Sequence, residues 1–179
     1  MAIELRKATN DDVPQIEALM RDSIRGLCPG FYDDTQIEST LRYTARLDPM
    51  LVEDRGFFVA VDDEDGAIVA CGGWSARAKL YAGSAPKGDE RRMIDPQTEP
   101  ARIRAMFVHP RAARRGLGRR ILQACEDEAR AAGFKRTVLV AMLSGEDLYR
   151  KTGYAPVQDA PITLQDGVVI GGTLMEKAI

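Results

Sequence analysis

Apolar residues recur at strand or helix spacing in the first third of the chain, and this pattern predicts its secondary structure. Residues 2–8 alternate between apolar and polar side chains, which is typical of a short strand. Residues 9–12 (Thr-Asn-Asp-Asp) supply a capping residue and first-turn acids, and apolar residues then follow every three or four positions. We therefore expect helices at about 11–25 and 34–46, with a break at residues 28–30 (Cys-Pro-Gly).

The middle of the chain predicts a β-hairpin, a long loop and a further strand. Two apolar runs, 56–61 and 67–76, flank an acidic turn that ends in glycine, which is typical of a hairpin. Residues 77–100 are polar and rich in glycine and proline, so we expect a loop that is either functional or a solvated insertion. The run 101–108 predicts the next strand.

The last third returns to alternating helices and strands. Its apolar spacing predicts a helix at 116–132, a buried strand at 137–141, a short helix at 146–152, and strands at 155–164 and 168–176 joined by a turn of sequence Gln-Asp-Gly. The resulting order is β-α-α-β-β-β-α-β-α-β-β without an internal repeat. With 179 residues, the chain is expected to form a single α/β domain that spans residues 1–179.

Composition excludes several classes of protein. The net charge of -2 argues against a protein that coats nucleic acid, and no apolar run is long enough to span a membrane. The three widely spaced cysteines are expected to be buried thiols of a cytoplasmic protein, because they form no paired motif and no secretion signal is evident. A single histidine makes a zinc site improbable, so we expect no metal.

Positive charge is concentrated in one turn, where five arginines occur within residues 111–120. This turn follows a predicted strand and a proline, and Gly116 and Gly118 open the predicted helix. A helix start has unpaired N–H groups and partial positive charge, so the turn is suited to bind phosphate, with the glycines allowing close approach. The alternative is an arginine-rich solvated surface.

The amino-acid sequence of this turn indicates a particular family of proteins. Residues 114–119 (Arg-Arg-Gly-Leu-Gly-Arg) resemble the acetyl-CoA signature of the GCN5-related N-acetyltransferase (GNAT) superfamily, although Ala113 stands where glutamine or arginine is usual. Residues 107–110 (Phe-Val-His-Pro) and 148–154 (Leu-Tyr-Arg-Lys-Thr-Gly-Tyr) match the superfamily in kind and order. The resemblance implies the GNAT fold, a mixed, largely antiparallel sheet of about seven strands flanked by about four helices.

The same resemblance implies how acetyl-CoA, the expected co-substrate, would be held. The residues concerned are Met106, Phe107 and Val108 for the pantetheine arm, and Arg114, Arg115, Gly116, Leu117, Gly118 and Arg119 for the pyrophosphate. The strand residues would pair their backbone with the pantetheine, as one strand pairs with another. The N–H group of Val108 would also polarise the thioester carbonyl.

The proton-transfer groups are less clearly marked. Tyr149 stands where the family often places its general acid, and its alternative role is that of a core aromatic. Met142 replaces an asparagine that commonly precedes that tyrosine, and Thr137 lies where some relatives place a basic glutamate. Glu99 is a weak candidate for the base, and a water relay is the other option. His109 is expected to be structural.

The expected function is acetyl transfer from acetyl-CoA to an amine by direct attack in a ternary complex. The alternatives are a non-catalytic acyl-CoA sensor on the same fold and, less favoured, a nucleic-acid contact through the arginines. Residues 24–50 and 77–100 should select the acceptor, but their mixed charges leave a small amine, an antibiotic, a polyamine or a protein amino group open. Trp74 could belong to the core or line the substrate pocket. A homodimer through the final strands is possible, because sheet edges pair readily.

Overall fold

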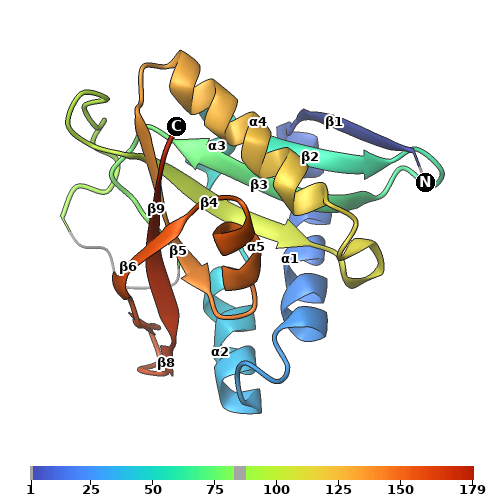
Figure 1. Cartoon of the computed structure of the whole chain (residues 1–179). Coiled ribbons are helices and arrows are strands. Elements are labelled where there is room, and N and C mark those ends of the chain that lie inside the picture. The colour runs from blue at the N-terminus through green and yellow to red at the C-terminus, as the bar shows by residue number, and fades with distance from the viewer. Residues whose placement is uncertain (1, 83–87) are drawn as a thin grey trace.

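A seven-stranded sheet forms the centre of the computed structural model, which describes residues 2–82 and 88–179 (Figure 1). The strand order is β1-β2-β3-β4-β5-β9-β6, and every neighbouring pair is antiparallel except β4 and β5. The strands are β1 (Ile3–Lys7), β2 (Phe57–Asp62), β3 (Ile68–Ser75), β4 (Ala101–Val108), β5 (Arg136–Met142), β6 (Ala155–Asp159) and β9 (Gly172–Ala178). The mixed, largely antiparallel sheet that the sequence predicted is confirmed.

Helices cover both faces of this sheet. They are α1 (Val13–Leu27), α2 (Asp34–Thr44), α3 (Pro49–Glu53), α4 (Leu117–Ala131) and α5 (Glu146–Lys151), with short 3-10 helices η1 (Asn10–Asp12) and η2 (Pro110–Ala112). In Figure 1, α4 and α5 lie in front of the sheet and α1 lies behind it. Among the described residues, no helix is long and apolar enough to cross a bilayer.

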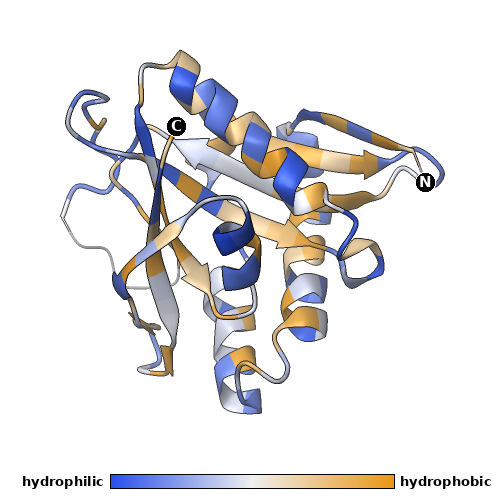
Figure 2. Ribbon diagram, in the orientation of Figure 1, coloured by the Kyte–Doolittle hydropathy of each residue, from blue (hydrophilic) through white to orange (hydrophobic). Residues whose placement is uncertain are grey.

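The two faces of the sheet carry separate apolar clusters. One cluster packs α1 and α2 against the sheet and includes Ile16, Met20 and Phe57, while the other packs α4 and α5 and includes Ile121 and Leu139. Figure 2 shows α4 changing repeatedly between hydrophilic and hydrophobic segments, as expected for a helix that lies with one side on a sheet. Strand β4 separates the clusters and contributes side chains to both.

The structure corrects the predicted elements at two places. The sequence pattern missed α3, which is only five residues long and begins at the Asp48-Pro49 cap. The two final predicted strands are each divided, because residues 162–163 (β7) and 169–170 (β8) form a small hairpin of their own outside the main sheet. This hairpin packs beside α2, where the Gln36 amide donates to the backbone of Val169 at 3.0 Å.

The parallel pair β4 and β5 determines where the site lies. These strands pair with each other only at Ala101 with Thr137 and at Arg102 with Val138, among the described residues. The remaining six residues of β4 therefore have β3 on one side and an open backbone edge on the other. This opening leads toward the N-terminus of α4 (Figure 1).

Candidate active site

Strand β4 carries a bulge beside the residues expected to bind the donor. Its register against β3 shifts within residues 71–73, and Ala105 adopts a left-handed conformation with φ of 53°. Such a conformation costs a non-glycine residue about 1–3 kcal/mol, so the surrounding structure must hold it in place. After the bulge, Met106 and Val108 pack into the α4 cluster, and Phe107 packs into the cluster on the opposite face.

The N-terminus of α4 is left without a side-chain cap. Gly116 occupies the cap position with φ of 79° and has no side chain that could cap the helix, and the first turn of α4 contains no acidic residue. A Cβ atom built on Gly116 would have no neighbour within 4 Å, so the backbone here is accessible. A helix end with free N–H groups and no anion of its own is suited to bind phosphate.

Gly118 has a different structural role from the one expected. A Cβ atom at Gly118 would lie 3.0 Å from Leu148 Cδ2 and 3.7 Å from Val108 Cγ2, so it would point into the protein. Gly118 therefore allows α4 to pack closely against α5 and β4, whereas the space around Gly116 is open. This contact brings the three elements of the expected site together.

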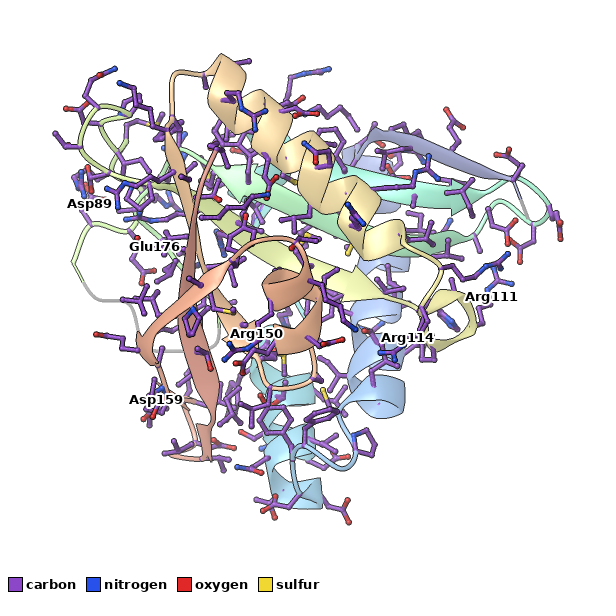
Figure 3. The ribbon with its side chains drawn as sticks, in the orientation of Figure 1. Asp89, Arg111, Arg114, Arg150, Asp159 and Glu176 are labelled. Atoms are coloured by element: carbon purple, nitrogen blue, oxygen red, sulfur yellow. The ribbon has the colours of Figure 1, made fainter. Side chains whose placement is uncertain are left out.

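The arginines of the turn divide into two groups. Arg111 is bound by the β2–β3 turn, at 2.9 Å from Asp65 and 3.5 Å from Asp62, and so points away from the start of α4 (Figure 3). Arg114 and Arg119 are exposed next to the helix start. Arg114 adopts φ of 64° and lies near enough to α5 to lower the pKa of Asp147, after the stronger effect of Lys151. These arginines place positive charge beside the uncapped helix.

Tyr149 of α5 lies in the same cluster as Met106, Val108 and Leu117. Its side chain is 8% exposed, and the structure records no hydrogen bond from its hydroxyl to any described residue. Burial raises the pKa of Tyr149 well above its ordinary value, and the nearby Cys125 contributes further. The phenol is therefore protonated at neutral pH, as a proton donor must be.

A buried polar network behind Tyr149 was not predicted from the sequence. The ring of Tyr154 packs edge-to-face on Tyr149 with centroids 5.8 Å apart. The Tyr154 hydroxyl lies 2.8 Å from the Thr137 hydroxyl and donates to Glu126 at 3.0 Å. Glu126 in turn accepts two hydrogen bonds from Lys177, at 3.0 and 2.9 Å. Thr137 thus supports the tyrosines and takes no part as a base.

The structure also decides between roles for three other residues. Glu99 accepts hydrogen bonds from Nη1 and Nη2 of Arg92, at 3.0 and 2.8 Å. These bonds, together with one from the Asp95 N–H, lower the pKa of Glu99 to about 2. His109 caps η2 by accepting from the Arg111 N–H, which agrees with a structural role. Trp74 donates to Glu128 at 2.8 Å and packs against the α4 side of the sheet, so it belongs to the core.

The face of the sheet opposite α4 is closed at one end by Tyr32, in the connection between α1 and α2. Its hydroxyl donates to the carbonyl of Gly171 at 2.7 Å and accepts from the N–H of Leu143 at 2.9 Å. These bonds tie the β7–β8 hairpin and the end of β5 to the first two helices. Met142, in place of the usual asparagine, packs into the apolar cluster of this face.

Comparison with known proteins decides the family. A sequence model of the acetyltransferase (GNAT) family matches residues 19–154, which include β4, the α4 turn and α5. The chain belongs to the GNAT acetyltransferase family. This confirms the family and the enzyme class that the turn and the Leu148-Tyr149 segment predicted.

Individual relatives support the same conclusion. The chain is 42% identical over 65 residues to the IAA acetyltransferase of Azospirillum brasilense, a match that covers 35% of this chain and 42% of that relative. A GCN5-related N-acetyltransferase from Rhodopseudomonas palustris shares its fold, with a TM-score of 0.74, 19% identity, and coverage of 100% of this chain and 97% of that one. The PaiA N-acetyltransferase of Thermoplasma acidophilum, solved with coenzyme A, has a TM-score of 0.69, 17% identity and full coverage of both chains.

Proposed function

We propose that this GNAT protein transfers an acetyl group from acetyl-CoA to an amine by direct attack in a ternary complex. The observation that carries the proposal is the opening between β4 and β5, which begins after two residue pairs and leads to the uncapped N-terminus of α4. An extended thioester ligand with a pyrophosphate at its far end has the shape and charge that this arrangement accepts.

The residues of β4 and the α4 turn fit the donor. The open edge formed by Met106, Phe107 and Val108 offers backbone groups to the pantetheine amides, as a neighbouring strand would. The amides of residues 114–119 offer N–H donors to the pyrophosphate. Acetyl-CoA brings the reactive thioester, and the N–H of Val108 would polarise its carbonyl, a kind of contact worth about 3 kcal/mol in other enzymes.

Tyr149 would then protonate the departing thiolate. Tyr149 belongs to the same cluster as the β4 residues that would hold the thioester, and its phenol is protonated. Neither Glu99 nor His109 is placed to take the amine proton, because other groups of the protein already occupy their acceptor atoms. We therefore propose that water carries this proton away.

Direct attack is favoured over an acetylated cysteine. Cys28, Cys71 and Cys125 are all buried, and burial raises the pKa of each thiol above its ordinary value. A thiol that stays protonated is a poor nucleophile. This leaves the acceptor amine to attack the thioester itself.

The test combines calorimetry of coenzyme A binding with a thiol-release screen of acceptor amines. We expect coenzyme A to bind, some amines to release thiol, and Tyr149→Phe to lower kcat by roughly 100-fold, as loss of a general acid does elsewhere. Coenzyme A affinity should stay within about threefold in this variant, because phenylalanine fills the same buried site. Binding of coenzyme A without thiol release from any amine would favour the acyl-CoA sensor.

A further inference from the structure

The face of β4 opposite α4 carries two arginines close to the bulge. Ile103 packs into the α4 cluster, so Arg102 and Arg104, one position to either side, lie on the opposite face. Arg104 is 6% exposed, which is unusual for an arginine. It directly precedes Ala105, the strained residue of the bulge.

Arg104 uses only part of its hydrogen-bonding capacity. Its Nη1 donates to Asp48 Oδ2 at 2.9 Å, and this is the hydrogen bond that the structure records for it among the described residues. A guanidinium has five N–H donors in a planar fork. Every fully buried side-chain nitrogen or oxygen of the described residues has a partner, so the remaining donors of Arg104 lie at a surface that solvent reaches.

Asp48 does not neutralise the positive charge on this face. It is shared between Arg104 and Lys79, whose Nζ lies 3.4 Å away, and it also caps α3 through the Met50 N–H. The partly buried Arg102 donates only to the backbone carbonyls of residues 78 and 100.

The other carboxylates near Arg102 are already engaged. Glu99 is paired with Arg92, and Glu176 lies 3.3 Å from Arg136. Lys79 and Arg104 therefore share Asp48, and no ion pair of Arg102 is recorded among the described residues. The face of β4 opposite α4 carries a surplus of positive charge.

The location of this charge connects it to the acceptor. This step rests on the proposed function: if the thioester lies along Met106 to Val108 with α4 on one side, the amine approaches from the other face of β4. Arg104 lies on that face, two residues before Met106, where β4 has already separated from β5. A group attached to the acceptor a few bonds from its amine would meet the guanidinium.

We propose that Arg104 binds an anionic group of the acceptor, so that the substrate is a small amine that also carries a carboxylate or phosphate. An arginine fork binds both groups through paired, charge-assisted hydrogen bonds. The same positive charge repels polyamines and polycationic antibiotics, which would have to bring further cations into a face that already has a surplus.

The test compares matched acceptors in the thiol-release assay with acetyl-CoA. The panel contains amino acids and the corresponding amino acid amides, phosphoethanolamine and ethanolamine, and spermidine. We expect at least one anionic amine to show a kcat/KM at least tenfold above that of its neutral counterpart, and the amino acid and phosphoethanolamine arms separate carboxylate from phosphate. Arg104→Met should lower kcat/KM for the anionic amine at least tenfold, mainly through KM, and change the neutral amine less than threefold.

Two further variants keep the result interpretable. Arg130→Met removes an exposed arginine of α4 that pairs with Asp127, and it should alter neither acceptor. If Arg104→Met does not fold, Lys79→Met on the same face should reduce the preference for the anionic amine at least threefold. Equal rates for every anionic amine and its neutral counterpart, or a preference for spermidine, overturn this inference alone. Absence of thiol release from every amine, with coenzyme A bound, overturns the proposed function and this inference with it.

Discussion

Removing Lys177 should destabilise the protein strongly, because it leaves the Glu126 carboxylate without its cation. Glu126 is 2% exposed and has both oxygens on Lys177, with one further hydrogen bond from Tyr154. Loss of one partner from a buried ion pair typically costs about 3–5 kcal/mol. The side chain of Lys177 is 24% exposed, so in a variant that lacks it water will partly solvate the Glu126 carboxylate.

We therefore expect Lys177→Met to lower the free energy of unfolding by about 3 kcal/mol at pH 7. Glu126→Gln should lose less, about 1–2 kcal/mol, since the partly exposed Lys177 can turn to solvent. The double variant should be more stable than the sum of the two single losses implies.

Urea unfolding at pH 7, followed by circular dichroism, measures these differences. Arg130→Met is the matched control, because its exposed pair with Asp127 should contribute less than about 0.5 kcal/mol. A loss below about 1 kcal/mol for Lys177→Met would show that the ion pair does not stabilise this part of the fold. The reasoning about the support of Tyr154, and through it of Tyr149, would then fail.

Two other predictions concern carboxylates with lowered pKa values. The hydrogen bonds of Arg6 and of the Thr9 backbone lower the pKa of Asp12 to about 2, so the ionised Asp12 should stabilise the fold above pH 4 and lose this effect as the pH falls toward 2. Asp12→Asn should cost about 1–2 kcal/mol at pH 7 after allowance for the exposure of Arg6, and thermal melts of both proteins should converge only as the pH falls to about 2. Glu99→Gln should leave the pH profile of kcat/KM between pH 6 and 9 unchanged, because a carboxylate with a pKa of about 2 that is bound by Arg92 does not titrate there. A shifted acidic limb, or a tenfold fall in kcat, would restore Glu99 as the base.

The donor side of the site could be predicted because its signals are local. Strand β4 has the bounds that its apolar run predicted, and the Gly-Leu-Gly turn starts α4 as expected. Even here the sequence did not show that Gly118 permits α4 to pack against Leu148, a residue 30 positions later. The chemistry of a turn is visible in the sequence, but the neighbours of its side chains are not.

The rest of the site depends on contacts between distant segments. Arg104 meets Asp48, 56 positions earlier, and Glu126 meets Lys177, 51 positions later. No spacing rule connects such residues, and α3 was missed because only the Asp48-Pro49 cap marks so short a helix. In the sequence, the charged residues that would select an acceptor therefore appeared only as a mixture of acidic and basic residues without a pattern.

The bulge in β4 explains why donor and acceptor should depend on different residues. A regular strand would alternate its side chains between the two faces without interruption. At Ala105 the alternation is offset, so Arg104 lies on one face while Met106 packs toward α4. The donor contacts come from the backbone of residues 106–108 and from α4, whereas the acceptor would meet side chains of the opposite face. Substitutions on that face should accordingly change the choice of amine and leave coenzyme A affinity intact.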